Sequence, residues 1–343
     1  MIFKNMPVKK AIFDRKNVLV IGGAGFIGSH LCDELVKNNK VICIDNFSTG
    51  SEKNIEHLLQ NPNFRFINHN IINSIDLEVL PELDFFKIKF QGVQEVYFLA
   101  SPASPVAYSK LKIETLLINS VGLYQALEMA VKYKAKLLFA SSPAIYGKVD
   151  SQPIKESFVG LVNHLTPRAV FAEAKRFGEI LVDNYRQIRN IDTKIVRIFN
   201  CYGPRMLLND GRMIPEMIKA AINNSDLLIY GDKNENLSLV YISDLIKGLI
   251  KVMESSETGP INLASEWKVG IEEVARKIIE LTNSTSKIIY QEKPNYFDVQ
   301  PLADISLAKE KLGWFPIILL DEGLKKTIDY LSAQQGIREI PIL

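Results

Sequence analysis

The stretch "NVLVIGGAGFIGSHLCDELVKNNKVICIDN" at residues 17–46 decides the fold of this chain. Its first five residues form a short, β-branched apolar run, which is typical of a parallel strand that is buried on both faces. Residues 26–38 then show helical apolar periodicity, and "KVICID" at 40–45 predicts a second strand. The stretch therefore predicts one strand–helix–strand unit.

Three glycines stand between the first predicted strand and the helix. Gly22, Gly25 and Gly28 have the spacing GxxGxxG. We expect Gly22 to permit a tight turn, Gly25 to let backbone N–H groups approach a pyrophosphate, and Gly28 to let the helix pack on the strand. Asp45 ends the second strand, where a carboxylate accepts from both ribose hydroxyls and repels a 2′-phosphate. The unit therefore predicts a dinucleotide site that prefers NAD to NADP.

The same alternation continues along the chain. Buried strands are predicted at 95–101, 135–142 and 193–200, and helical segments such as 113–133 separate them. Alternating strands and helices predict an α/β fold with a doubly wound parallel sheet, the Rossmann arrangement.

Composition excludes several classes of protein. The chain has 343 residues, is 47% hydrophobic and 23% charged, and carries a formal charge of +2, so no strong attraction to nucleic acid or to a membrane is expected. Cys32, Cys43 and Cys201 are widely spaced, which predicts neither a disulfide framework nor a metal site. Residues 1–14 lack the pattern of a signal peptide, and no apolar run is long enough to span a bilayer. We expect a cytoplasmic protein.

Motifs in the order found here resemble the extended short-chain dehydrogenase/reductase family of NAD-dependent nucleotide-sugar enzymes, the UDP-glucuronate decarboxylases most of all. The resemblance covers residues 16–330. The motifs on which the resemblance rests are "IGGAGFIGSHL", "CIDNFSTG", "FLASPASP", "FASSPAIYG", "RIFNCYGPRM", "VYISDL" and "ADISLAKEKLGW".

The resemblance implies an organisation and a chemistry. Residues 1–199 and 238–265 would form the NAD-binding domain, and residues 200–237 and 266–343 a smaller interleaved substrate-binding lobe. Helices around 110–133 and 168–190 would pair in a homodimer. In this family NAD accepts a hydride from C4 of the sugar, and the resulting 4-keto group permits decarboxylation, dehydration or epimerisation.

The resemblance also implies site residues. Ser142 takes the position that bonds the reacting hydroxyl, and Lys175 takes that of the lysine on the nicotinamide ribose. The expected cofactor-binding residues are Gly22, Gly25, Phe26, Ile27, Gly28, Asp45, Asn46, Asn70, Ala100 and Lys175, and the expected substrate-binding residues are Ser142, Arg168, Asn200, Arg205 and Arg212.

Four positions depart from the family pattern. Phe171 stands at the catalytic tyrosine position, and Ala144 stands where decarboxylases and dehydratases carry an acid. Leu237 and Pro301 (with Leu302) stand where arginines are expected on the substrate diphosphate. Phenylalanine has no proton-accepting atom, and general acid–base catalysis contributes on the order of 10²–10⁴-fold. Water, His164, Lys175 itself or a group that the sequence does not identify would then take the proton.

Two hypotheses follow. In the first, the chain is a nucleotide-sugar enzyme with altered acid/base groups, or an engineered Tyr-to-Phe variant of one. In the second, it is an NAD-binding pseudoenzyme without turnover. A structure separates them by showing whether an ionisable group reaches the reactive face of the nicotinamide.

Overall fold

The computed structural model describes residues 15–149, 152–232, 235–292 and 301–338. The segment 1–14, for which no signal peptide is expected, lies outside the described residues. In the described part of the chain, no helix is both long and apolar enough to cross a membrane. The expected cytoplasmic location stays a prediction.

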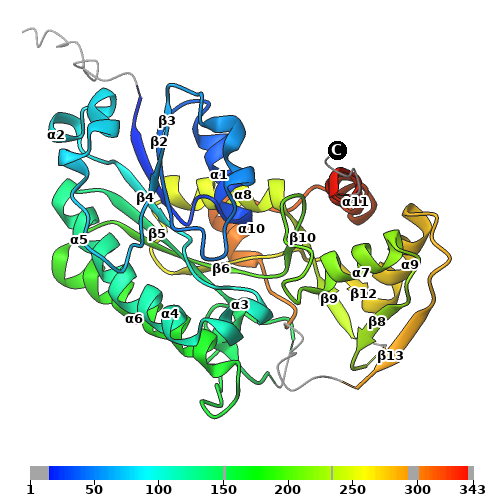
Figure 1. Cartoon of the computed structure of the whole chain (residues 1–343). Coiled ribbons are helices and arrows are strands. Elements are labelled where there is room, and N and C mark those ends of the chain that lie inside the picture. Colours follow the sequence, from blue (N-terminus) through cyan, green and yellow to red (C-terminus); the bar gives the residue numbers. More distant parts are fainter. Residues whose placement is uncertain (1–14, 150–151, 233–234, 293–300, 339–343) are drawn as a thin grey trace, which may run out of the picture.

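A seven-stranded parallel sheet forms the centre of the larger part of the molecule (Figure 1). The strand order is β11-β6-β5-β4-β1-β2-β3, so the direction of winding reverses between β1 and β4. In open α/β sheets, ligands bind at the carboxyl ends of the strands at such a reversal. The strands are β1 (Asn17–Ile21), β2 (Lys40–Asp45), β3 (Phe64–Asn68), β4 (Glu95–Phe98), β5 (Lys136–Ser141), β6 (Thr193–Ile198) and β11 (Pro260–Leu263).

Both faces of the sheet are covered, as the continuous apolar strands predict. Val18 and Val20 face one core, which contains residues of α1 (Phe26–Leu35) and α8 (Ile242–Glu254). Leu19 and Ile21 face a second core with α5 (Leu123–Tyr133) and α6 (Ala169–Arg189). The predicted doubly wound α/β fold is therefore confirmed.

A smaller group of elements lies beyond the carboxyl edge of the sheet (Figure 1). Strand β8 (Leu227–Tyr230) pairs with β13 (Ile288–Gln291), and β9 (Asn236–Ser238) pairs with β12 (Lys268–Gly270). Helices α7 (Met213–Ile222), α9 (Ile271–Leu281) and α11 (Leu320–Arg338) contact one another. A two-residue pairing of β7 (Cys201–Tyr202) with β10 (Val240–Tyr241) joins this group to the sheet.

Two local expectations differ from the structure. The predicted strand 95–101 ends at Phe98, because residues 99–104 leave the sheet and line a pocket. The helical segment 113–133 is divided into α4 (Lys112–Leu117), a π-helical turn (Ile118–Gly122) and α5. At that turn Gly122 lies so close to Ile71 that a Cβ would stand 3.1 Å from its Cγ2 atom.

Candidate active site

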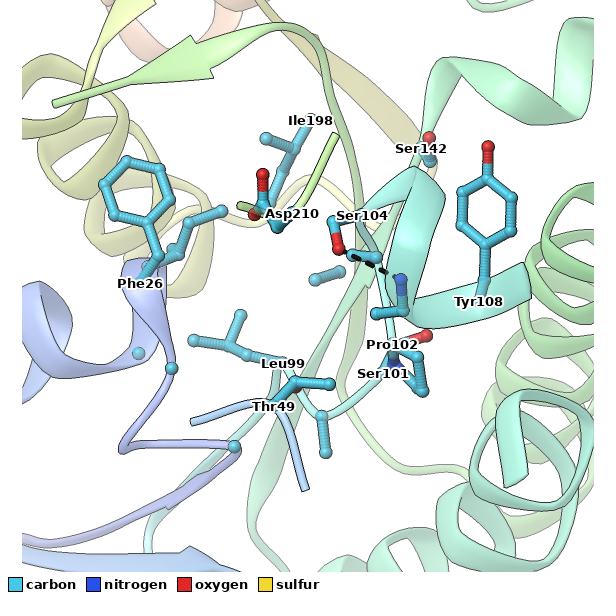
Figure 2. A pocket seen from close by; sticks show the side chains of 18 of the residues that line it. Phe26, Thr49, Leu99, Ser101, Pro102, Ser104, Tyr108, Ser142, Ile198 and Asp210 are labelled. Carbon is cyan, nitrogen blue, oxygen red and sulfur yellow. Dashed lines mark hydrogen bonds between the residues drawn. The ribbon is translucent and has the colours of Figure 1, made fainter. Parts of the chain in front are cut away.

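One pocket lies where the carboxyl ends of the sheet strands meet the smaller group of elements. All the residues predicted to bind cofactor or substrate line it, together with Phe171 and Leu237. Figure 2 shows Phe26 on one side of the pocket and Tyr108 with Ser142 on the other. The set consists of Gly22, Gly25, Phe26, Ile27, Gly28, Asp45, Asn46, Asn70, Ala100, Ser142, Arg168, Lys175, Asn200, Arg205 and Arg212.

The glycine loop between β1 and α1 has no room for side chains at two positions. Gly22 has φ +85°, and a Cβ there would lie 2.6 Å from the backbone nitrogen of Ala100. A Cβ on Gly28 would lie 2.1 Å from the carbonyl oxygen of Gly22. Gly25 precedes the first residue of α1, so the unpaired N–H groups and the positive end of that helix face the pocket. This cradle fits a pyrophosphate.

Asp45 holds the loop and keeps free lone pairs. The backbone N–H of Ala24 donates to its Oδ2 (3.0 Å), and the N–H of Phe47 donates to its Oδ1 (2.8 Å). Burial raises the pKa of the carboxyl, and these hydrogen bonds oppose the rise. A carboxylate accepts about four hydrogen bonds. Asp45 therefore still has acceptors to offer a ribose.

Lys175 is the most perturbed cation of the site. Its side chain is 3% exposed, and Nζ donates to the carbonyl of Ala140 (2.8 Å). Nζ lies 5.8 Å from the centre of the Phe171 ring and 4.9 Å from that of Phe139. Burial lowers the pKa of Lys175 to about 7, against the opposing charge of Glu179. The amine therefore sits next to the ring at position 171, one helical turn away on α6.

Ser142 follows β5 and begins the short helical turn Pro143–Tyr146. Its Oγ accepts from the N–H of Ala144 (3.2 Å), so the hydroxyl hydrogen remains available to a ligand in the pocket. Ala144 itself does not line the pocket. It packs in a small buried cluster with Tyr108, Phe171 and Ala172.

The two arginines of the segment 200–212 are already paired with carboxylates. Arg205 is paired with Asp33 on α1 (2.7 Å), although its Nη1 atom is buried without a hydrogen-bond partner. Arg212 lies 3.5 Å from Asp210, a carboxyl whose pKa burial raises and Arg212 lowers. A ligand in the pocket thus meets guanidinium groups that are partly neutralised by carboxylates.

The residues that stand where diphosphate-binding arginines are expected do not all lie in the pocket. Leu237 lines it, whereas Pro301 and Leu302 do not. Leu237 lies on β9, is 4% exposed and lines the pocket with Leu239 and Ile271. The backbone carbonyl of Leu302 accepts a hydrogen bond from the N–H of Ile154 (2.8 Å).

His164, a proton acceptor considered from the sequence, and the neighbouring-motif residue Tyr146 do not line the pocket. His164 is exposed in the segment that precedes α6, and it is not a lining residue. Tyr146 is fully buried, accepts from Arg197 and donates to Asn262, which is a packing role. No group of three or more His, Cys, Asp or Glu side chains that suits a metal occurs in the ranges that the structure describes.

Two lining residues were missed by the sequence reasoning. Tyr108 on α3 (Pro105–Lys110) stacks on Phe171, with ring centres 5.3 Å apart and planes at 16°. Asp210 projects into the pocket in Figure 2. Tyr108 comes three residues after the motif "FLASPASP", and Asp210 lies two residues before Arg212, so each is close to a feature that points to the site.

Comparison with known proteins agrees with this geometry. Residues 18–265 match the NAD dependent epimerase/dehydratase family. UDP-glucuronic acid decarboxylase 1 of Xenopus tropicalis is 37% identical over 322 residues, which cover 94% of this chain and 73% of that protein.

Solved structures share the fold. The UDP-glucose 4-epimerase of Thermotoga maritima, solved with UDP-glucose, is 26% identical with a TM-score of 0.81, covering 93% of this chain and 99% of that one. A tyrosine-to-phenylalanine mutant of the UDP-glucuronic acid 4-epimerase of Bacillus cereus was solved with UDP-4-deoxy-4-fluoro-glucuronic acid and NAD. It is 28% identical with a TM-score of 0.80, covering 93% of this chain and 99% of that one.

Proposed function

The chain belongs to the NAD dependent epimerase/dehydratase family, and from this premise we propose that it binds NAD and a nucleotide sugar and oxidises the sugar at C4. The observation that carries the proposal is the single pocket that holds the glycine cradle, Asp45, Ser142 and Lys175 together. The relatives at 37% identity are UDP-glucuronic acid decarboxylases. A UDP-glucuronate-like sugar is therefore the first substrate to test.

The cofactor half of the pocket fits NAD. Gly22 and Gly28 carry no side chains, and none would fit there. The backbone of the loop and the start of α1 are therefore open to a pyrophosphate. Asp45 would accept from the adenosine ribose hydroxyls, and Lys175 would hold the nicotinamide ribose. Bound NAD supplies the acceptor for a hydride from the sugar.

The sugar half has three polar groups in position. Ser142 donates its hydroxyl hydrogen to the reacting oxygen. Arg212 lies at the N-terminus of α7, where its guanidinium and the helix end both favour an anionic group of the substrate. Asn200 follows β6 at the carboxyl edge of the sheet.

A second function is favoured by the replaced residues. Phe171 and Ala144 belong to one apolar cluster, and Leu237 gives the lining an apolar side chain where an arginine is expected. With these groups the pocket also suits an NAD-binding protein without turnover. This pseudoenzyme hypothesis and the enzyme hypothesis differ in whether a proton acceptor serves the sugar hydroxyl.

The surface of α4, α5 and α6 supports a homodimer. Exposed apolar side chains gather on these neighbouring helices, and patches of this kind mark association sites. They are Ile113, Leu116, Leu117, Val121, Tyr124, Phe177, Ile180 and Ile188. We expect two copies to pair through this helical face.

A paired assay tests the proposed function. The parent protein and its Phe171→Tyr variant are loaded with NAD and given UDP-glucuronate, UDP-glucose and dTDP-glucose, and the products are identified by mass spectrometry. Conversion of one sugar by both proteins, faster in the variant, is the expected result. Binding of NAD with no conversion by either protein would leave the pseudoenzyme hypothesis instead.

A further inference from the structure

The part of the pocket around Phe171, Lys175 and Ser142, which we call its acid/base corner, contains a phenol. This phenol belongs to Tyr108 and not to the residue at the catalytic tyrosine position. Tyr108 is the only tyrosine among the described residues that line the pocket. Its ring is stacked on the Phe171 ring, 5.3 Å between centres and nearly parallel. The ring that carries the phenol therefore lies directly against the ring at position 171.

The short helix α3, which carries Tyr108, is fixed at its start and against the substrate side of the pocket. Ser104 caps this helix by accepting from the N–H of Ala107 (3.3 Å), and Pro105 takes its first position. The N–H of Val106 donates to the carbonyl of Asp210, which ties α3 to the substrate side of the pocket. The Tyr108 side chain is thus positioned by the same segments that form the pocket.

The small residue at 144 belongs to the same arrangement. Ala144 packs with Tyr108 and Phe171, and its N–H donates to Ser142 Oγ (3.2 Å). This chain of contacts connects the phenol-bearing ring to the serine that bonds the reacting hydroxyl. In Figure 2 the hydroxyls of Tyr108 and Ser142 point in the same direction.

The start of α6 and two basic residues lie around this corner. Phe171 is the third residue of α6, so the ring stack stands at the positive end of a 21-residue helix. The Nζ atom of Lys175 lies 5.8 Å from the centre of the Phe171 ring, and Arg168 lines the pocket immediately before α6. The acidic groups that line the same pocket are Asp45, Glu114 and Asp210, of which Asp210 is paired with Arg212.

We propose that Tyr108 is the proton acceptor that replaces the phenol missing at position 171. In its phenolate form the Tyr108 Oη would accept the proton of the sugar C4 hydroxyl. The hydride (the C4 hydrogen with its bonding electron pair) would leave the same carbon, and NAD in the pocket would supply its acceptor. The proton returns from Tyr108 Oη when the hydride is returned. This inference rests on the proposed function, because it requires a sugar hydroxyl in the pocket.

Five proteins test the inference: the parent, Tyr108→Phe, Phe171→Tyr, the double variant with both changes, and one control variant. The substitution Tyr108→Phe keeps the ring and its stack, and Tyr133→Phe on α5, outside the pocket lining, is the matched control. Each protein is loaded with NAD, the hydride step is followed with UDP-glucuronate, and binding of the same sugar is measured by calorimetry.

The expected result is a loss on the order of 10²–10⁴-fold in the hydride step for Tyr108→Phe, with sugar binding changed by less than about threefold. The double variant recovers part of the rate, because its phenol now stands at 171. The rate of Tyr133→Phe equals that of the parent.

Two other results overturn the inference and separate it from the proposed function. If Tyr108→Phe keeps the parent rate, or if only proteins with Phe171→Tyr react, Tyr108 is not the acceptor although the proposed function stands. If no protein of the set binds UDP-glucuronate or transfers a hydride from it, the proposed function fails as well.

Discussion

The Nζ atom of Lys175 lies 5.8 Å from the centre of the Phe171 ring, one helical turn along α6. A lysine in this place normally has a phenol beside it in the family that the chain resembles, and here it has a hydrocarbon ring. Its pKa of about 7 results first from burial, and Glu179 offsets only part of it. The amine is thus an ionisable group at the core of the site whose charge changes near neutral pH.

This buried amine predicts a pH dependence of stability. The unfolded chain holds the Lys175 proton up to the ordinary pKa of 10.5, whereas the folded chain releases it near 7. Between these values the unfolded state binds more protons, so the free energy of unfolding rises with pH, and below about 7 the full cost of the buried charge applies. In NAD-free protein, Lys175→Met should therefore have a higher free energy of unfolding than the parent at about pH 6. This difference should disappear by about pH 10.

Denaturant midpoints of the parent and Lys175→Met at several pH values measure this difference. Lys37→Met is the control, because Lys37 is exposed on the surface near the end of α1 and pairs with Glu34. A stabilisation by Lys175→Met that is equal at all pH values would show that the amine does not titrate near 7 in the folded protein.

The glycine cradle predicts a steric effect at Gly28. A methyl group there would meet the carbonyl oxygen of Gly22 at 2.1 Å, so α1 must move away from β1. We expect Gly28→Ala to cost about 1–3 kcal/mol of stability and to weaken NAD binding. Thermal unfolding with and without NAD measures both effects.

Gly259 provides the matched control for that change. A Cβ on Gly259 meets nothing within 4 Å, so Gly259→Ala should leave both stability and NAD affinity unchanged. If Gly28→Ala bound NAD as the parent does, the loop would not be the pyrophosphate site.

Asp45 predicts the choice of dinucleotide. Hydrogen bonds to a charged group contribute about 1.5–3 kcal/mol, which corresponds to roughly 10- to 100-fold in affinity. Asp45→Asn should weaken NAD binding by this factor and narrow the preference for NAD over NADP, because the repulsion of a 2′-phosphate is removed. Calorimetric titration with both dinucleotides is the measurement, and Asp76→Asn on the exposed surface is the control. If Asp45→Asn kept the preference of the parent for NAD over NADP, the adenosine ribose would not bind at Asp45.

The exposed face of α4 and α6 predicts the oligomeric state. Ile180 is 61% exposed on α6, and a charge at this position should split a dimer that buries it. Sedimentation should give a dimer for the parent and a monomer for Ile180→Glu. Phe90 on α2 (Ile88–Gln91) is 83% exposed away from that face, so Phe90→Glu should remain dimeric. A monomeric parent would contradict the predicted pairing.

The sequence predicted the parts of the fold whose signal is local. The strand–helix–strand unit at 17–46 follows from apolar runs and glycine spacing, and the structure places β1, α1 and β2 there. Strand β3 was not predicted, because only Phe64 of its five residues is buried and the apolar signal is weak. The pairs β8–β13 and β9–β12 join residues that are far apart in sequence, and such short strands leave no local pattern.

The residues of the site also fall into those that the sequence predicted and those that only the structure reveals. Gly22, Asp45 and Ser142 belong to motifs, and the structure brings them to one pocket. The stack of Tyr108 on Phe171 depends on how α3 packs against α6, which no spacing in the sequence reveals. His164 was a candidate because it precedes α6, but its side chain is exposed outside the pocket lining.

Transient reduction of the bound cofactor would show oxidation of the sugar at C4 within a single turnover. The NAD-loaded parent protein is mixed rapidly with UDP-glucuronate, and the near-ultraviolet absorbance of reduced nicotinamide is recorded within a single turnover. We expect this absorbance to appear, and to rise faster in Phe171→Tyr than in the parent. Saturating sugar that binds to both proteins without any reduced nicotinamide would contradict oxidation at C4.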